Sequence, residues 1–273
     1  MRYKLRKKLY ACIVIWRRFW PATAYLCGMN LLVCISQAPD TTSRIAFTNE
    51  DREFDSNGVQ YIVNPYDEWY ALVRAIELKA QQGGKVTTIT VGGAGCDPII
   101  RKALAIGADD AVRIDSEPTD ALQVARLIAD YATGKEYDVV LCGKETIDHN
   151  GAVVPAMLAE LLDCGFVANA THLEVNGSEA QVKREAAGGE EHVKVALPLV
   201  LSAAKGMAEQ RIPNMRGIMS ARTKPLTVET GSAEGGTRIE RFALPPEKGA
   251  CKMIDADNAE ELIRLLREEA KAI

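Results

Sequence analysis

The sequence lacks the residue patterns that mark most catalytic centres. Histidine occurs three times, and none of His149, His172 and His192 has the spacing to a cysteine or serine that a triad or metal site requires. No GxGxxG motif follows the first apolar run, and Gly143-Lys144 lacks the glycine at position 138 and the hydroxyl residue at position 145 of a Walker loop. These absences argue against phosphoryl transfer and hydrolysis, and they favour a binding or carrier role over a stand-alone enzyme.

Paired cysteines are also missing. The seven cysteines are odd in number, scattered along the chain and free of CxxC spacing. This distribution predicts neither a disulfide framework nor a zinc site. It indicates reduced thiols that mostly pack in the interior of a protein in a reducing compartment, so a cytoplasmic location is expected.

Acidic residues are absent from the first 39 positions, which carry seven basic residues before Met29. The remainder therefore has 26 basic residues against 37 acidic ones, a net charge of −11. Such a surface repels nucleic acid, which is not an expected partner.

Residues 1–28 form a basic N-terminal extension. Its apolar run is too short to span a bilayer and is ended by Arg17 and Arg18, so no integral membrane segment is expected. Two interpretations stay open. The extension is a targeting leader with a small-residue cleavage site, or Met29 is the true start, because a buried strand pattern begins there. The fold is expected to begin at Met29 in both cases.

Apolar runs alternate with helical patterns over the next part of the chain. Residues 139–142 are a continuous apolar run that predicts a buried parallel strand, and further strands are predicted at 31–36, 85–91 and 111–114. Helical patterns follow at 65–82, 98–106, 119–131 and 157–162. This alternation with short connections predicts a doubly wound, mostly parallel α/β sheet of the adenine-nucleotide-binding, Rossmann-like type.

The segment between the first strand and the first helix also has predictable features. Residues 37–41 are expected to form a ligand-facing loop after the first strand, and 45–47 with 60–63 short extended pieces around a turn at 56–58. Asn64 is expected to cap the next helix, with Pro65 at its first position and two acidic residues in its first turn.

The alternation of strand and helix patterns ends after Cys164. Strand-like segments at 166–174, 180–184, 192–196 and 199–202 predict antiparallel additions to the edge or end of the sheet. Residues 205–222 predict a surface loop and short helix whose methionines are either core packing or an apolar contact surface. From 223 onward we expect an extended arm ending in an amphipathic helix at 259–270, capped by Asp257 or Asn258. The predicted parts are thus 1–28, 29–222 and 223–273.

The segment from Tyr137 to Leu162 is the centre of the expected site. It contains a buried strand, a polar loop from Lys144 to Gly151 and a helix. In parallel sheets such a loop lies where backbone N–H groups and the positive end of a helix favour an anion. It is the first candidate for a phosphate site, and an ordinary strand-to-helix connection without a ligand is the alternative.

With these loops in order, the sequence from Met29 onward resembles the beta subunit of electron transfer flavoprotein, the small subunit of a heterodimeric flavin electron carrier. The matching motifs are Asn64-Pro65 with Asp67-Glu68, Leu104 to Asp109, Gly143-Lys144 with Ile147-Asp148, Val182 to Glu185 with Gly188-Gly189, Leu197-Pro198, and Ile218-Met219 after Glu209 and Arg211. Their order and spacing together are specific.

The resemblance implies a fold that holds AMP structurally, while the redox FAD lies mainly on an alpha subunit. By position, the nucleotide site would use Cys34, Asn64, Pro65, Tyr66, Asp67, Val91, Gly92, Gly143, Lys144, Asp148, Gly151, Val153 and Val154. Contacts to partner proteins would involve Asp40, Thr41, Glu185, Arg211, Met215 and Met219. Glu185 matches a carboxylate that faces the alpha subunit, and residues 211–220 match a loop that docks acyl-CoA dehydrogenases of fatty acid oxidation, with Met215 as its apolar anchor.

Two departures from the family pattern affect the expected site. Val153, Val154 and Pro155 stand where beta subunits commonly show glutamine followed by glycine, which removes a polar contact and a backbone donor. Ala187 replaces an acidic residue. In some members a second FAD occupies the AMP position, and the sequence leaves AMP and FAD open.

Two rival functions make different predictions. A single-chain adenine-nucleotide hydrolase or ATP pyrophosphatase predicts a Ser-Gly-Gly phosphate loop after the first strand, where this chain has Ser36-Gln37-Ala38-Pro39. A nucleotide-sensing homodimer predicts stable folding alone, which the arm from 223 onward does not favour. We therefore expect an electron carrier subunit that is redox-active with its alpha subunit.

Overall fold

The computed structural model describes residues 28–247 and 249–273. The predicted extension therefore lies, apart from Gly28, outside the described residues. Contacts divide the chain into two units. The larger unit runs to Ile45 and resumes over Ser56–Ile239, and the smaller one comprises Ala46–Asp55 with Glu240–Ile273.

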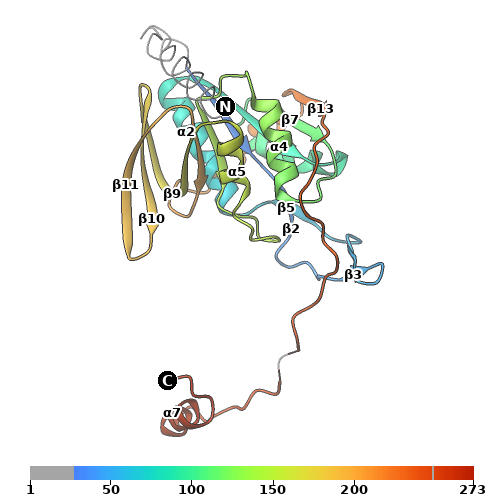
Figure 1. Ribbon diagram of the computed structural model, residues 1–273, viewed down its shortest axis with the longest axis vertical. Coiled ribbons are helices and arrows are strands. Elements are labelled where there is room, and N and C mark those ends of the chain that lie inside the picture. The colour runs from blue at the N-terminus through green and yellow to red at the C-terminus, as the bar shows by residue number, and fades with distance from the viewer. Residues whose placement is uncertain (1–27, 248) are drawn as a thin grey trace, which may run out of the picture. The chain divides into compact units, whose positions relative to one another are not determined.

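The larger unit is built on a nine-stranded sheet with the order β11-β10-β9-β12-β8-β1-β6-β7-β13 (Figure 1). The strands are β1 (Met29–Cys34), β6 (Gly84–Val91), β7 (Asp110–Asp115), β8 (Val139–Gly143), β9 (Gly165–Asn176), β10 (Glu179–Ala186), β11 (Gly189–Ala196), β12 (Leu199–Ala203) and β13 (Leu226–Thr230). β9, β12, β8, β1, β6 and β7 each pair in parallel with the next strand in this order, which ends with β13. β10 pairs antiparallel with both of its neighbours, β9 and β11. The predicted doubly wound sheet with added antiparallel strands is confirmed.

Helices cover both faces of the parallel part. α2 (Asp67–Gln82) and α3 (Asp97–Ile106) pack on one face, and α4 (Ala121–Ala132) and α5 (Val154–Leu161) on the other (Figure 1). Successive residues of a strand point to opposite faces, so a strand covered on both sides is mostly apolar on both of them. In β1, Leu31 and Val33 enter one core cluster, whereas Leu32 and Cys34 enter the other.

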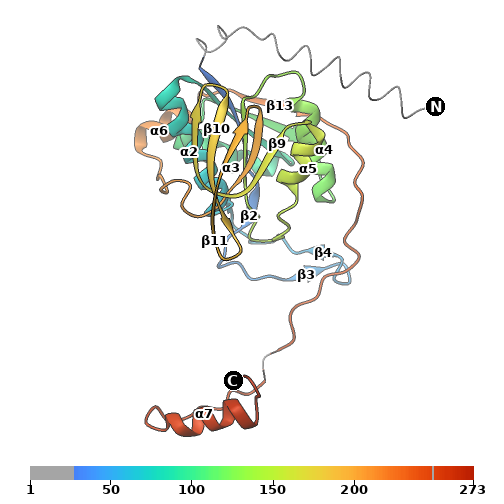
Figure 2. The same cartoon turned by 60° about the vertical axis from the view of Figure 1, so that its left-hand side comes forward.

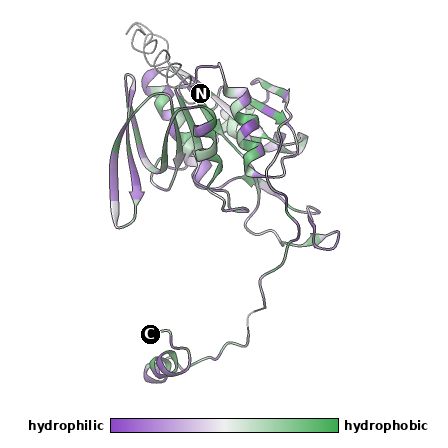
Figure 3. Cartoon of the chain, in the orientation of Figure 1, coloured by the Kyte–Doolittle hydropathy of each residue, from purple (hydrophilic) through white to green (hydrophobic). Residues whose placement is uncertain are grey.

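The antiparallel extension consists of β9, β10 and β11 (Figure 2). Figure 3 colours much of the β10–β11 hairpin as hydrophilic, in agreement with its exposed side chains. The prediction that residues 199–202 belong to this addition is wrong. Leu199, Val200 and Leu201 are fully buried, because β12 lies inside the parallel sheet between β8 and β9.

Residues 226–230, expected in an extended arm after a boundary at 222, form β13 parallel to β7. Two side chains explain why the chain stays on the sheet here. Lys224 Nζ donates to the Leu104 carbonyl at the end of α3 at 2.8 Å, and Arg101 Nη1 donates to the Lys224 carbonyl at 2.8 Å. The larger unit consequently extends to Ile239.

The connection after β1 also differs from its prediction. Residues 37–39 form strand β2 (Gln37–Pro39), antiparallel to β5 (Tyr61–Val63), where a loop was expected. The next paired strands, β3 (Phe47–Thr48) and β4 (Glu53–Phe54), are joined through residues 49–52, and the turn at 56–58 joins no hydrogen-bonded strands. A 3₁₀ turn, η3 (Ala94–Cys96), separates β6 from α3, and a short helix, α6 (Met215–Ala221), precedes β13.

The smaller unit holds the β3–β4 hairpin and the C-terminal arm. The Phe242 N–H donates to the Asp51 carbonyl at 2.7 Å, and the rings of Phe47 and Phe242 stack with centroids 4.8 Å apart. The arm ends in α7 (Ala259–Glu268), where the Asn258 side chain accepts from the Glu261 N–H at 3.2 Å, as a cap should. Over residues 28–247 and 249–273, no helix combines the length and apolar character needed to cross a membrane.

Candidate functional site

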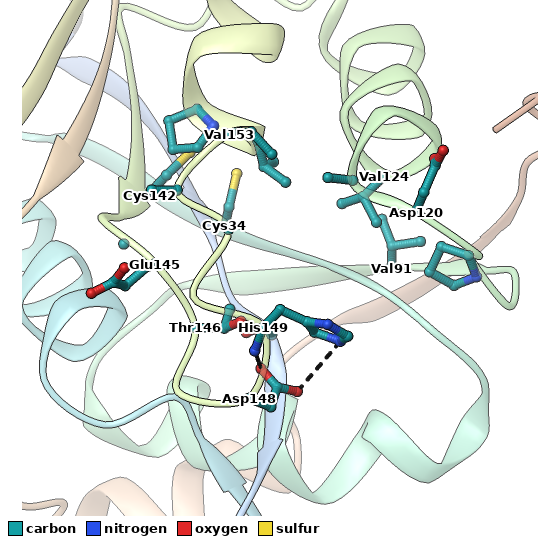
Figure 4. A pocket seen from close by; sticks show the side chains of 18 of the residues that line it. Cys34, Val91, Asp120, Val124, Cys142, Glu145, Thr146, Asp148, His149 and Val153 are labelled. Carbon is teal, nitrogen blue, oxygen red and sulfur yellow. Dashed lines mark hydrogen bonds and ion pairs between the residues drawn. The ribbon is translucent and has the colours of Figure 1, made fainter. Parts of the chain in front are cut away.

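A cavity of about 650 Å³ opens in the larger unit beyond the carboxyl ends of β1, β6 and β8. Its wall comes from those strand ends, the loop between β8 and α5, the first turns of α4, and residues after β13. Figure 4 shows how Cys34, Val91, Val124 and Val153 reach it from four different elements. Parallel strands end at the same edge of a sheet, so residues distant in sequence converge at this edge.

The cavity brings together some of the residues expected in a nucleotide site. Those that line it are Cys34, Val91, Gly143, Lys144, Asp148, Gly151, Val153 and Val154. Those that do not are Asn64, Pro65, Tyr66, Asp67 and Gly92. The loop from 143 to 155 is therefore the main predicted element at the cavity. The segment from Asn64 to Asp67 does not line the cavity but supports this loop.

Asn64 connects that segment to the loop through hydrogen bonds of its side chain. Its side chain does not cap α2; the residue at the cap position is Tyr66, which has φ 68° and makes no side-chain cap bond. Instead the Asn64 Nδ2 donates to the Glu145 carbonyl at 2.9 Å, and its Oδ1 accepts from the Ile147 N–H at 3.0 Å. The side chain is fully buried and satisfied by the loop, so Asn64 fixes the shape of the loop that lines the cavity.

Glu68 is a buried carboxyl at the cavity wall. Its Oε2 accepts from the Ser36 N–H at 2.8 Å, and its Oε1 accepts from the Ser36 hydroxyl at 2.7 Å. Burial raises its pKa to about 8, with smaller contributions from Asp148 and Asp67, although the bonds from Ser36 act in the opposite direction. At neutral pH this carboxyl is mainly protonated, so it adds little negative charge to the cavity.

The polar part of the wall lies on the loop after β8. Lys144 Nζ pairs with Glu145 Oε1 at 2.9 Å, and this bond raises the pKa of the lysine. His149 lies beside Asp148, with Nε2 and Oδ2 3.8 Å apart (Figure 4). The loop thus presents a cation and a histidine, each balanced by a neighbouring carboxylate.

Two thiols form part of the apolar floor. Cys34 and Cys142 are buried on the neighbouring strands β1 and β8. The hydrogen bond from Cys34 and the burial of the site hold the pKa of Cys142 well above its ordinary value. Both thiols lie in a protected, apolar setting that suits packing against a ligand more than nucleophilic chemistry.

Asp120 stands on the opposite side of the cavity, at the start of α4. Its carboxylate accepts from the Gln123 N–H at 2.8 Å and from the N–H groups of Gly236 and Thr237 at 2.5 and 2.6 Å. These bonds lower the pKa of Asp120 to about 2. The sequence did not point to this residue as part of the site, nor to Glu68 or Thr237. The only local signal was a capping residue after Pro118-Thr119.

The model of the electron transfer flavoprotein domain matches residues 52–233 of the chain. A curated relative, electron transfer flavoprotein subunit beta of Bacillus subtilis (strain 168), is 39% identical over 261 residues, which cover 90% of this chain and all of the relative. The chain belongs to the electron transfer flavoprotein beta subunits. The human beta subunit is 29% identical over 251 residues, covering 88% of this chain and 97% of the relative.

Another relative is named acryloyl-CoA reductase electron transfer subunit gamma, from Anaerotignum propionicum. It is 28% identical over 266 residues and covers 88% of this chain and 99% of its own length. Membership of the beta-subunit family confirms an electron-transfer role as a carrier subunit rather than an enzyme. It also implies an alpha subunit as partner.

The residues expected at partner contacts lie on the surface of this beta subunit. Thr41, Glu185, Arg211, Met215 and Met219 are exposed, and Asp40 is half-buried. The segment before α6 is anchored from α2, because Trp69 Nε1 donates to the Arg211 carbonyl at 3.1 Å. Lys102 Nζ lies 4.8 Å from the centroid of the Trp69 ring. One helix, α2, therefore supports both the cavity through Glu68 and the exposed loop through Trp69.

Proposed function

We propose that this beta subunit binds AMP in the cavity, completes the FAD site of its alpha subunit, and receives electrons from flavin dehydrogenases. Acyl-CoA dehydrogenases are the expected donors, and the electrons would continue toward the respiratory chain. The family supports the electron-carrier part. The cavity at the carboxyl edge of the sheet is the observation that supports nucleotide binding.

The cavity suits a mononucleotide in size and chemistry. Its volume of about 650 Å³ lies within the range of roughly 300–1,000 Å³ that is usual for small-molecule sites. Its floor is apolar, with Cys34, Val91 and Val124 available to pack against a base. Gln37 Oε1, on the same wall, is buried and has no hydrogen-bond partner among the described residues, so it can accept a hydrogen bond from an amino group of a ligand.

The phosphate of the nucleotide would lie at the start of α5. The first N–H groups of a helix lack partners within the helix and, with the helix dipole, favour an anion. Gly151 and Val154 border the cavity at this point, and Lys144 contributes positive charge. The neutral state of Glu68 at pH 7 also removes one repulsive charge. These residues fit a nucleoside monophosphate such as AMP.

The flavin would supply the redox chemistry, and the chain would bind, orient and dock. Glu185 projects from the antiparallel extension and is expected at the alpha subunit. On the loop and helix near 211–220, Ile212, Met215 and Met219 are 81%, 73% and 68% exposed. Exposed apolar side chains next to charged ones are typical of a docking site, so this loop would seat in a pocket of the dehydrogenase.

Co-expression with the alpha subunit tests the proposal. The purified heterodimer would be denatured and the released nucleotides separated and quantified. One FAD and one AMP per heterodimer are expected. Two FAD and no AMP would replace AMP by a second flavin in the cavity. A colourless homodimer that hydrolyses ATP would overturn the carrier function and favour the hydrolase alternative.

A further inference from the structure

One part of the cavity wall is formed by a segment outside the helices and strands. Residues 233–239, which we name the strap, follow β13 and run past the start of α4 (Figure 1). Thr237 and Ile239 of the strap line the cavity, together with Thr119 and Asp120. Strand ends and helices build much of the remaining wall, and these elements hold their shape through their own hydrogen bonds. The strap depends on contacts with α4.

Three side chains on one face of α4 provide those contacts. Gln123 Nε2 donates to the Ala233 carbonyl at 2.9 Å, and Arg126 Nη1 donates to the Glu234 carbonyl at 2.6 Å. Asp120 Oδ2 accepts from the N–H groups of Gly236 and Thr237 and from the Thr237 hydroxyl, the last at 3.2 Å. Residues three positions apart are neighbours on a helix surface, so this series of side chains holds the strap along the first two turns of α4.

The two oxygens of Asp120 have separate partners. Oδ1 accepts from the Gln123 N–H and caps α4, whereas Oδ2 receives all the bonds from the strap. Bonds from N–H groups to a carboxylate are among the stronger hydrogen bonds in proteins. The helix cap and the strap contact can therefore be separated by changing one oxygen.

The strap also lies too close to α4 for larger residues. A Cβ added at Gly235 would lie 2.9 Å from Thr119 Oγ1 and 3.2 Å from Asp120 Oδ1. Ala233 packs against the core cluster under α4. The close approach and the hydrogen bonds from three side chains place the strap flush against the helix, where it closes the cavity on that side.

We propose that Asp120 is a positioning residue that retains the nucleotide by holding the strap against α4 as a wall of the cavity. This inference rests on the proposed function, since it assumes that the cavity binds AMP. When the strap leaves α4, Thr237 and Ile239 leave the wall, and the affinity for AMP falls in proportion to the fraction of molecules with a closed wall.

The sign of a mutational effect separates this role from a purely electrostatic one. Asp120 borders the cavity, so its charge repels an anionic ligand. If the charge alone mattered, Asp120→Asn would bind AMP more tightly. If the strap matters, the same variant binds more weakly, because its amide group would face two N–H donors, while its remaining oxygen still caps α4.

The experiment measures the affinity of the nucleotide-depleted full chain for AMP by calorimetry, and amide hydrogen exchange across residues 231–239. Asp120→Asn and the uncharged Gly235→Val variant are expected to lose about tenfold or more in AMP affinity, with faster exchange in the strap. Asp130→Asn is the matched control. It removes the same charge from an exposed position of α4 and should stay within about twofold of the original protein.

Weaker binding with faster strap exchange in both variants, and not in the control, would support the inference. Equal or tighter AMP binding by Asp120→Asn would overturn it and leave the proposed nucleotide function intact. Failure of the unmodified chain to bind AMP would overturn the nucleotide function and, with it, this inference. A far-UV spectrum unchanged in Asp120→Asn would show that α4 remains folded.

Discussion

The Glu68 carboxyl accepts two hydrogen bonds from Ser36, from the backbone N–H at 2.8 Å and from the hydroxyl at 2.7 Å. This pair joins the start of α2 to the end of β1 at the wall of the cavity. Although both bonds favour the ionised carboxylate, burial dominates and leaves the folded-state pKa at about 8. The protonation of Glu68 should therefore change both the stability of the fold and the charge at the cavity as pH changes.

Glu68→Gln should remove a pH dependence of stability. The folded state keeps a proton that the unfolded state releases above its ordinary pKa of 4.5, so the free energy of unfolding from this group falls as pH rises from about 4.5 to 8. The slope is about 1.4 kcal/mol per pH unit within that window, and it should disappear in the variant. Urea unfolding from pH 5 to 9 measures it. Glu160→Gln, an exposed change on α5, is the control and should keep the original slope.

Asn64→Ala should weaken both the fold and the cavity. The buried side chain satisfies the Glu145 carbonyl and the Ile147 N–H, which would lose their partner. We expect a loss of about 2–4 kcal/mol in the free energy of unfolding, and weaker AMP binding because the loop loosens. Asn30→Ala changes an exposed asparagine of β1 and should have little effect on either measurement. An unchanged unfolding midpoint for Asn64→Ala would contradict the supporting role of Asn64.

The double variant Met215→Ser/Met219→Ser should separate docking from folding. Both side chains are largely exposed, so the free energy of unfolding should change by no more than about 0.5 kcal/mol. Loss of an apolar anchor should reduce the rate of flavin reduction by a partner acyl-CoA dehydrogenase by about tenfold or more, as for an interface hot spot. Stopped-flow absorbance at the flavin band measures this rate. Val228→Thr, an exposed change on β13, should leave it unchanged.

Val153→Gln should tighten nucleotide binding. Val153 lies beside the cavity and is 40% exposed, so a longer polar side chain there can reach a bound ligand. A glutamine there would add one hydrogen bond to the ligand, worth about 1 kcal/mol or roughly a fivefold gain in AMP affinity. Val153→Leu, which adds bulk but no polar group, should bring no gain, and equal gains in both variants would count against a polar contact.

The strands β1, β6, β7 and β8 of the parallel sheet and the helices that follow them were predictable because local patterns decide them. Val139 to Cys142 is apolar at every position, as is typical of a strand covered on both faces, and this pattern is visible in a single segment. The position of β12 was not predictable from its pattern. Leu199 to Leu201 would read the same on any buried strand, and only the pairing with β8 and β9 places them inside the sheet.

The candidate site divides in a similar way. The loop after β8 was predicted, because a polar segment between a buried strand and a helix lies at the ligand edge of a parallel sheet. Asn64 was expected to cap a helix, since its preference for caps is local, but its amide pairs with a loop 81 and 83 residues away. The bonds from the strap to Asp120 span 116 and 117 residues, which no local pattern reveals.

The sequence by itself determined the α/β class, the alternation of strand and helix segments along the chain, and the edge of the sheet where a ligand is expected. Through its motifs it also determined the family. These features follow from periodicity, turn residues and short-range capping, which act within a few residues. Tertiary structure alone decided the place of β12 and β13, the protonated state of Glu68 and the strap that closes the cavity. Each of those depends on burial or on hydrogen bonds between distant segments, and such contacts exist only once the sheet has assembled.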